Sequence, residues 1–277
     1  MGNTSGRGTG LEGCHEKQSD WNKGRKLKIK IDGPLKEIRM IVVGKMGVGK
    51  SSLCNTLLGL NRFEYGDSMS AVTITAQVGC VDRFKRNIFV IDTPGFRDLD
   101  KTSDQEIIEL ASHICEHMLR ISPGFHCIAM VLNADERFSS EDKEVIEDVK
   151  KVFGNNVMDH MILVYNKCNG QEDIENLLKT TNPEFCKLLA EVNGRVFPVY
   201  RDSADYEKQA CARAFFERVD ALCSDMGAIY TNEMLLEAWK AVENEIKTPH
   251  DRMRIKDLQK KIDRLRLVRY FLNLFRS

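Results

Sequence analysis

Short apolar runs alternate with amphipathic stretches through the centre of the chain. Runs typical of buried strands occupy residues 38–43, 127–132, 161–165 and 195–199. Two further strands, joined by a tight, charged turn, are predicted over 77–83 and 87–91. Helical spacing of apolar residues covers 50–58, 104–120, 139–153, 184–192 and 206–223. Strands that alternate with helices in this way predict an α/β fold with a mainly parallel sheet and helices on both faces.

The pattern changes at both ends of the chain. Residues 1–35 are rich in Gly, Ser, Thr, Asn and Lys and contain few apolar residues, which indicates a flexible tail. From about residue 231 the pattern is helical only, Pro249 interrupts it, and a final helix is predicted to the last residue. We therefore expect a tail over 1–35, a folded domain over 36–225 and a helical extension over 226–277.

Composition supports a globular domain and limits the classes of partner. The 277 residues are 42% hydrophobic and 30% charged, values that permit a sizeable core. The 41 basic and 41 acidic residues cancel, so nucleic acid is not an expected partner. The C-terminal end differs, because residues 250–277 contain nine Lys/Arg against three Asp, a local charge of +6.

Cysteine usage and the lack of long apolar runs predict a cytoplasmic protein. The nine cysteines are odd in number and include no C-x-x-C pair, which indicates reduced thiols instead of a disulfide framework. The first residues lack the apolar core of a secretion signal, and no apolar run is long enough to suggest a membrane span. We therefore expect a cytoplasmic location, with peripheral contact to membranes as a further option.

The strongest chemical signal is a glycine-rich loop between the first predicted strand and the first predicted helix. The loop reads Gly44-Lys45-Met46-Gly47-Val48-Gly49-Lys50-Ser51, and in this position such a loop wraps backbone N–H groups around nucleotide phosphates. Lys50 is expected to pair with the β- and γ-phosphates and to assist catalysis, and Ser51 is expected to bind Mg²⁺ through its hydroxyl. The predicted nucleotide contacts in this loop are Gly47, Val48, Gly49, Lys50, Ser51 and Ser52.

Two downstream segments supply further candidate ligands. Asp92-Thr93-Pro94-Gly95 follows a predicted strand, which would let Asp92 hold Mg²⁺ through water and leave the Gly95 N–H to meet a γ-phosphate. Between this segment and the phosphate loop, residues 70–75 offer a threonine that can contact both Mg²⁺ and the γ-phosphate. Thr73 is the preferred residue for this metal-binding and catalytic role, and Thr75 is the alternative.

The candidate base-binding segment is Asn166-Lys167-Cys168-Asn169, which follows the strand predicted over 161–165. GTPases commonly carry N-K-x-D here, and the Asp accepts hydrogen bonds from guanine N1–H and the 2-amino group. Asn169 occupies the Asp position, and an amide offers one acceptor and one donor. Guanine is therefore expected to bind more weakly, unless Glu172 or Asp173 substitutes. The predicted base contacts in this segment are Asn166, Lys167 and Asn169.

These motifs resemble those of the AIG1/GIMAP family of septin-like GTPases. The shared features are the loop over 44–52, Val72-Thr73, Asp92-Thr93-Pro94-Gly95-Phe96 and the segment over 123–154. That segment contains Pro-Gly-Phe-His and Glu-Arg-Phe-Ser-Ser-Glu-Asp, which are similar to a conserved box between the family's third and fourth GTPase motifs. The resemblance covers residues 36–225. It implies a P-loop GTPase domain that uses GTP or GDP with Mg²⁺ and forms a homodimer or oligomer through its nucleotide face.

Departures from the family pattern limit the expected chemistry. The family usually has Asn in its fifth motif, near Tyr200-Arg201, and Tyr200 is the remaining candidate to stack on the base. Phe96 occupies the place where Ras-like GTPases use Gln to orient the attacking water. Glu116 occupies the place where some members supply a catalytic Arg across a dimer, with His117 and Arg120 nearby. Slow intrinsic GTP hydrolysis is therefore expected.

The motifs are compatible with more than one function. A Mg²⁺-dependent nucleotide switch is the first interpretation, and a nucleotide-binding interaction module without turnover is the alternative. A P-loop ATPase or small-molecule kinase is disfavoured, because Asp92-Thr93-Pro94-Gly95 and Asn166-Lys167 are typical of GTPases.

The C-terminal extension contains one amphipathic helix. Apolar residues recur there with 3-4-3 spacing among basic residues, namely Ile255, Leu258, Ile262 and Leu265. Such a stripe indicates a helix face that must be buried. It is compatible with packing on the folded domain, with a coiled coil or dimer helix, and with docking on an anionic membrane.

Overall fold

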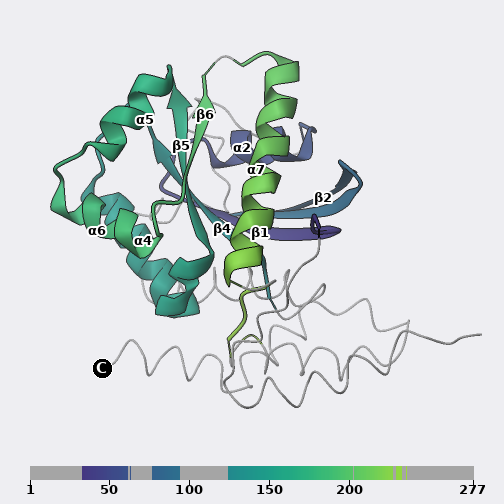
Figure 1. Cartoon of the computed structure of the whole chain (residues 1–277), viewed down its shortest axis with the longest axis horizontal. Helices are drawn as coiled ribbons and strands as arrows, with labels where there is room; N and C mark the ends of the chain where they lie inside the picture. The colour runs from purple at the N-terminus through teal and green to yellow at the C-terminus, as the bar shows by residue number, and fades with distance from the viewer. Residues whose placement is uncertain are drawn as a thin grey trace, which may run out of the picture.

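The predicted alternation of strands and helices is present in the computed structural model (Figure 1). The structure describes residues 33–61, 63, 77–93, 124–201, 203–226, 229–232 and 235. The helix predicted over 104–120 lies outside these residues, as do most of the predicted N-terminal tail and nearly all of the C-terminal extension. No helix in the described part of the chain is both long and apolar enough to cross a membrane.

Within the described residues, six strands form one sheet in the order β2-β3-β1-β4-β5-β6. The strands are β1 (Glu37–Val43), β2 (Gln77–Arg83), β3 (Arg86–Asp92), β4 (Cys127–Asn133), β5 (Met161–Cys168) and β6 (Val196–Tyr200). Neighbouring strands are parallel except β2 and β3, so the predicted mainly parallel sheet is confirmed. Because β1 pairs with β3 on one side and β4 on the other, the strand order reverses at β1. Ligands of such sheets bind beyond the carboxyl ends of the strands at this point.

Helices cover both faces of the sheet. They are α2 (Lys50–Leu58), α4 (Ser140–Phe153), α5 (Gln171–Leu178), α6 (Pro183–Glu191) and α7 (Asp205–Met226), with the 3-10 helix η1 (Asn155–His160). Figure 1 shows α4, α5 and α6 on one side of the sheet and α2 and α7 on the other. The helices predicted in these regions are confirmed to within a few residues at each end. Helix α5 was not predicted, because it is short and buries only Ile174.

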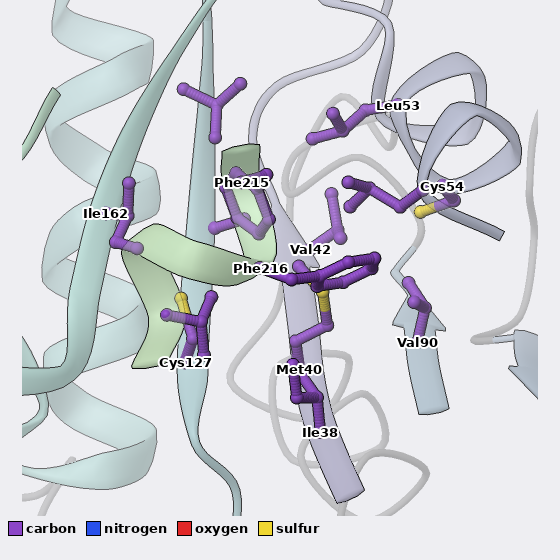
Figure 2. Packing of buried hydrophobic residues seen from close by; sticks show 14 of the residues in the cluster. Ile38, Met40, Val42, Leu53, Cys54, Val90, Cys127, Ile162, Phe215 and Phe216 are labelled. Carbon is purple, nitrogen blue, oxygen red and sulfur yellow. The ribbon is translucent and has the colours of Figure 1, made fainter. Parts of the chain in front are cut away.

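The sheet separates two hydrophobic cores, because successive side chains of a strand point to opposite faces. Ile41 of β1 packs in the core beneath α4 and α6. Its neighbours Met40 and Val42 pack in the core beneath α2 and α7. Figure 2 shows the second core, in which Phe215 and Phe216 of α7 lie against the strand residues. The second core includes Val48 of the glycine-rich loop, so this loop is packed against the domain.

The chain crosses to the other face of the sheet after α7. Tyr230 exchanges two backbone hydrogen bonds with Phe125, at 3.1 and 2.6 Å, and its hydroxyl donates to the Phe153 carbonyl at the end of α4. Leu235 is buried in the core beneath α4 and α6. These residues of the predicted extension therefore pack on the domain. The amphipathic stripe within residues 250–277 lies outside the described residues.

Candidate functional site

The glycine-rich loop joins the carboxyl end of β1 to the first residue of α2. Gly47 and Gly49 have φ values of 76° and 95°, a region that other residues rarely adopt. A Cβ atom on Gly49 would lie 2.3 Å from Nδ2 of Asn166. Glycine at this position therefore allows the candidate base-binding segment to touch the phosphate loop.

The Lys50 side chain is folded into the loop that precedes it. Lys50 is 7% exposed, and its Nζ donates to the backbone carbonyl of Lys45 at 2.9 Å. The N-cap residue of α2 is Gly49, which has no side-chain capping bond to the helix. Loop, ammonium and helix N-terminus together form an environment that favours an anion. Within the predicted set of nucleotide contacts, the Val48 side chain is buried and the Ser52 side chain is exposed on α2.

Ser51 and Asp92 form the second part of the site. The Ser51 hydroxyl donates to Asp92 Oδ2 at 2.7 Å, which joins the start of α2 to the end of β3. Asp92 is fully buried. The next residue is anchored as well, because the Thr93 hydroxyl donates to the Val42 carbonyl at 2.7 Å. Asp92 is therefore held beside the phosphate loop by contacts on two elements.

The surroundings of Asp92 fit a bound cation. Burial raises the pKa of the Asp92 carboxyl, while the Ser51 hydrogen bond and the Lys50 charge act in the opposite direction. Its Oδ1 atom is buried and has no hydrogen-bond partner among the described residues. Mg²⁺ needs only one or two protein oxygens, since it keeps several of its waters. The Ser51 hydroxyl and the Asp92 carboxylate are an oxygen pair of this type.

The candidate base-binding segment contacts the phosphate loop from the end of β5. Asn166 Nδ2 donates to the Val48 carbonyl at 2.8 Å, and Lys167 Nζ donates to the Gly47 carbonyl at 3.4 Å. Lys167 has a positive φ of 65°, which turns the chain at the end of the strand. The structure therefore brings together the two segments that sequence analysis assigned to phosphate and base.

Asn169 and Tyr200 lie in exposed positions near the start of α5. The Asn169 backbone N–H donates to Asp173 Oδ2 at 2.7 Å, so this carboxylate already stabilises the turn into α5. The Tyr200 hydroxyl donates to Gln171 Oε1 at 3.2 Å. One oxygen of Asp173 is thus already occupied. Glu172 is exposed, which makes it the better candidate to replace the missing guanine acceptor.

The remaining predicted ligands lie outside the described residues. They are Thr73 with its alternative Thr75, Gly95, and the positions Phe96 and Glu116 that bear on hydrolysis. Their predicted roles stay predictions. Among the described residues there is no group of three or more His, Cys, Asp or Glu side chains that could form a complete metal cage.

Two ion pairs in this region were not predicted from the sequence. Lys45 of the phosphate loop pairs with Glu136 at 2.6 Å, and Arg201 after β6 donates to Asp135 at 2.6 Å. Both acidic residues belong to the loop between β4 and α4. The Ala134 N–H of the same loop donates to the Asn166 carbonyl at 2.8 Å. No local pattern signals these contacts, because each joins segments that are distant in the sequence.

The sequence is similar to those of characterised families. A model of the AIG1 family matches residues 38–249. The chain is 29% identical over 212 residues to Immune-associated nucleotide-binding protein 10 of Arabidopsis thaliana, with 73% of this chain and 44% of the relative covered. It is 29% identical over 167 residues to GTPase IMAP family member 8 of Mus musculus, with 57% of this chain and 23% of the relative covered. The chain thus spans less than half the length of these relatives.

The fold is similar to that of solved GTPases. Toc33 from Arabidopsis thaliana in complex with Mg²⁺ and GMPPNP aligns with a TM-score of 0.54 and 18% sequence identity, covering 79% of this chain and 92% of Toc33. A dimerization-deficient mutant of Toc33 aligns with a TM-score of 0.55 and 16% identity, covering 79% and 91%. At these identities the likeness concerns the fold, which is that of a P-loop GTPase domain.

Proposed function

Because the chain belongs to the AIG1 family, we propose that it binds GTP and GDP with Mg²⁺ and acts as a nucleotide-dependent switch. The observation that carries the proposal is the Ser51–Asp92 pair beside the glycine-rich loop and Lys50. These groups supply a cation site and an anion site next to each other. A nucleoside triphosphate with its metal ion needs this combination.

The residues of the site have separate roles in this proposal. The loop N–H groups and the N-terminus of α2 bind the phosphates, and the Lys50 ammonium pairs with the β- and γ-phosphates. Ser51 holds Mg²⁺ through its hydroxyl, and Asp92 holds it through water. When bound, Mg²⁺ neutralises charge on the phosphate oxygens. Thr73 and Gly95 complete the γ-phosphate site in the triphosphate state.

Guanine recognition is assigned to the rim formed by the ends of β5 and β6. Asn166 and Lys167 support it through their bonds to the phosphate loop. Tyr200 is 41% exposed, which leaves its ring accessible for stacking on a base. Asn169 offers one acceptor and one donor, so it matches only one of the two guanine donors and selects guanine less strictly than Asp.

Slow hydrolysis and assembly complete the proposed function. Phe96 cannot orient a water molecule and Glu116 cannot act as an arginine finger, so we expect slow conversion of GTP to GDP and phosphate. Met46 in the phosphate loop is 58% exposed and gives the nucleotide face an apolar side chain. This supports a homodimer or oligomer formed through that face. A nucleotide-binding module without turnover is the second candidate, favoured by the same two substitutions.

Titration of the full chain with GTP, GDP, ATP and XTP, with and without Mg²⁺, tests the proposal. We expect GTP and GDP to bind with similar affinity, ATP to bind weakly, and Mg²⁺ to strengthen GTP binding. Lys50→Met should remove binding, whereas Lys143→Met, a change to an exposed ion pair between α4 and α6, should not. Preference for ATP would reject the GTPase assignment. Bound GTP that stays intact at high protein concentration would favour the module without turnover.

Cytoplasmic location and membrane contact are proposed separately. The nine Lys/Arg of residues 250–277 and the apolar stripe between them suit an anionic membrane surface. Flotation of the full chain with liposomes that contain an anionic lipid, compared with a chain that ends at residue 249, tests this contact. Equal binding by both chains rejects a role for the basic helix in membrane docking.

A further inference from the structure

The Lys45 side chain leaves the phosphate loop and ends among groups of the β4–α4 region. Its Nζ lies 2.6 Å from Glu136 Oε2 and 3.6 Å from Asp142 Oδ2. It also donates to the Ser139 hydroxyl at 3.4 Å. The Lys45 side chain is 12% exposed, whereas the Glu136 side chain is 48% exposed, so the ammonium lies at the inner end of a partly exposed ion pair. Lys45 belongs to the phosphate loop, but its side chain thus makes its contacts within the protein.

The groups that receive Lys45 are themselves held in place. Asn133 Nδ2 donates to the second oxygen of Glu136 at 2.5 Å. Asp142 Oδ2 accepts the Ser139 N–H at 2.9 Å and the Ser139 hydroxyl at 2.8 Å, as part of the capping box of α4. Asp142 is only 3% exposed. Glu136 and Asp142 are therefore also held by contacts that do not involve Lys45, at the end of β4 and the start of α4.

Lys45 offsets part of the negative charge in this cluster, in which one ammonium faces two acidic side chains. Burial acts to lower the pKa of Lys45, but its hydrogen bond to Glu136 and the charge of Asp142 raise it overall. The Lys45 hydrogen bond in turn lowers the pKa of Glu136. Lys45 and Glu136 are thus both ionised at neutral pH. Without the ammonium, two carboxylates next to the phosphate loop would repel an anionic ligand.

The backbone of Lys45 connects this cluster to the phosphate site. Its carbonyl oxygen accepts a hydrogen bond from the Lys50 ammonium at 2.9 Å. A side chain anchored in the cluster restricts the orientation of its own peptide, and the orientation of that peptide decides where the carbonyl points. Lys50 is the group proposed to meet the β- and γ-phosphates.

We propose that Lys45 is a positioning residue for phosphate binding: its ion pairs with Glu136 and Asp142 fix the loop so that the Lys45 carbonyl aligns the Lys50 ammonium. The inference rests on the proposed nucleotide binding, since it assigns Lys45 a role in that same site. It predicts a defect confined to the phosphates that Lys50 contacts. A lysine that only stabilised the fold would show no such selectivity.

The test compares Lys45→Met with Lys150→Met in the full chain. Lys150 of α4 is a matched control, because its side chain is 13% exposed and pairs with Glu191 of α6 at 2.8 Å. Affinities for GTP, GDP and GMP are measured by competition with a fluorescent guanine nucleotide, together with the thermal midpoint. We expect Lys45→Met to weaken GTP and GDP binding by about tenfold, while GMP binding and the Lys150→Met protein stay within about twofold of the wild type.

Two further variants keep the test decisive. Lys45→Arg retains the charge and should restore most of the affinity for GTP and GDP. Glu136→Gln should reproduce the defect of Lys45→Met, and the double variant should be no weaker than either single variant, because both changes break one contact. Glu136→Gln also provides the test if Lys45→Met does not fold.

The outcomes separate this inference from the proposed function. If the wild type and Lys150→Met bind GTP and Lys45→Met binds it equally well, the positioning role is rejected while the proposed function stands. An equal loss for GMP, or a defect of Lys45→Met that Lys45→Arg shares, also rejects the positioning role. If the wild type binds no guanine nucleotide, the proposed function and the inference both fail.

Discussion

Asp92 ends β3 with one carboxylate oxygen bonded to Ser51 and the other without a partner among the described residues. Burial solvates the charged form of this group poorly, and it raises the pKa of Asp92 despite the opposing effects of Ser51 and Lys50. A nearby cation would stabilise the carboxylate. At the scale of single residues, the affinity for metal and the charge of Asp92 are therefore linked.

Replacing Asp92 with Asn tests this link. The amide keeps the shape and the contact with Ser51 but removes the charge, so Mg²⁺ should no longer strengthen GTP binding. In the wild type we expect Mg²⁺ to strengthen it by at least about tenfold, or about 1.4 kcal/mol. Isothermal titration calorimetry measures the affinity for GTP with and without Mg²⁺ in the wild type and in Asp92→Asn. Asp148→Asn is the control, because Asp148 is also buried but pairs with Lys151 on α4; a persisting Mg²⁺ effect in Asp92→Asn would contradict the assignment.

Gly49 offers a second test at the residue scale. A methyl group there would lie 2.3 Å from Asn166 Nδ2 at a φ of 95°, so Gly49→Ala should destabilise the protein by about 2 kcal/mol. It should also weaken nucleotide binding, because the loop and Asn166 must move apart. Gly170→Ala is the control, since no atom lies within 4 Å and the backbone is extended. Urea unfolding of both variants measures the difference, and equal stabilities would be inconsistent with the close contact.

At the scale of elements, His126 joins the start of β4 to its neighbour β1. Its Nδ1 accepts the Arg39 N–H at 2.9 Å, and its carbonyl is contacted by His160 Nδ1 at 3.1 Å and more weakly by the Cys223 thiol. The side chain is buried, and burial followed by the Arg39 charge lowers the pKa of His126 to about 3. The imidazole is therefore neutral in the folded protein across the physiological range.

This neutral histidine predicts acid sensitivity. The unfolded chain binds a proton at His126 near pH 6.5 while the folded chain does not until about pH 3, so stability falls as the pH drops through this window. The contribution between pH 7 and pH 5 is about 2 kcal/mol. His126→Asn keeps an acceptor for the Arg39 N–H and cannot be protonated, so its unfolding free energy should lose less over the same range. Equal pH dependence of the two proteins would rule out His126 as the cause.

At the scale of the whole molecule, Tyr230 joins the segment after α7 to the opposite face of the sheet. Its ring packs 5.1 Å from that of Phe125 and 5.5 Å from that of His160. Its hydroxyl and the Asn232 side chain both donate to the Phe153 carbonyl. The two faces of the domain are therefore connected by a segment outside the regular elements.

Removing the Tyr230 side chain should expose the importance of this connection. We expect Tyr230→Ala to lower the unfolding free energy by about 3 kcal/mol, as for other buried aromatic side chains. Tyr206→Ala is the control, because Tyr206 is 73% exposed and its loss should cost less than about 0.5 kcal/mol. Thermal and urea unfolding measure both variants. A small effect of Tyr230→Ala would mean that the segment contributes little to the stability of the domain.

The sequence by itself determined the strands, most of the helices and the phosphate loop of this protein. Apolar periodicity depends on which face of an element is buried, and the glycine spacing of residues 44–49 depends on local backbone geometry. Both are readable from neighbouring residues. Helix α5 was missed because its single buried side chain gives no period.

Only the tertiary structure decided which distant segments meet. The strand order brings the end of β5 to the phosphate loop, so that Asn166 bonds to Val48. It also brings Lys45 to Glu136 and Arg201 to Asp135 through the loop after β4. The two ion pairs carry no periodic or motif signal, because their energy depends on the distance between side chains after folding. That distance is fixed by the packing of the whole sheet, which no short stretch of sequence contains.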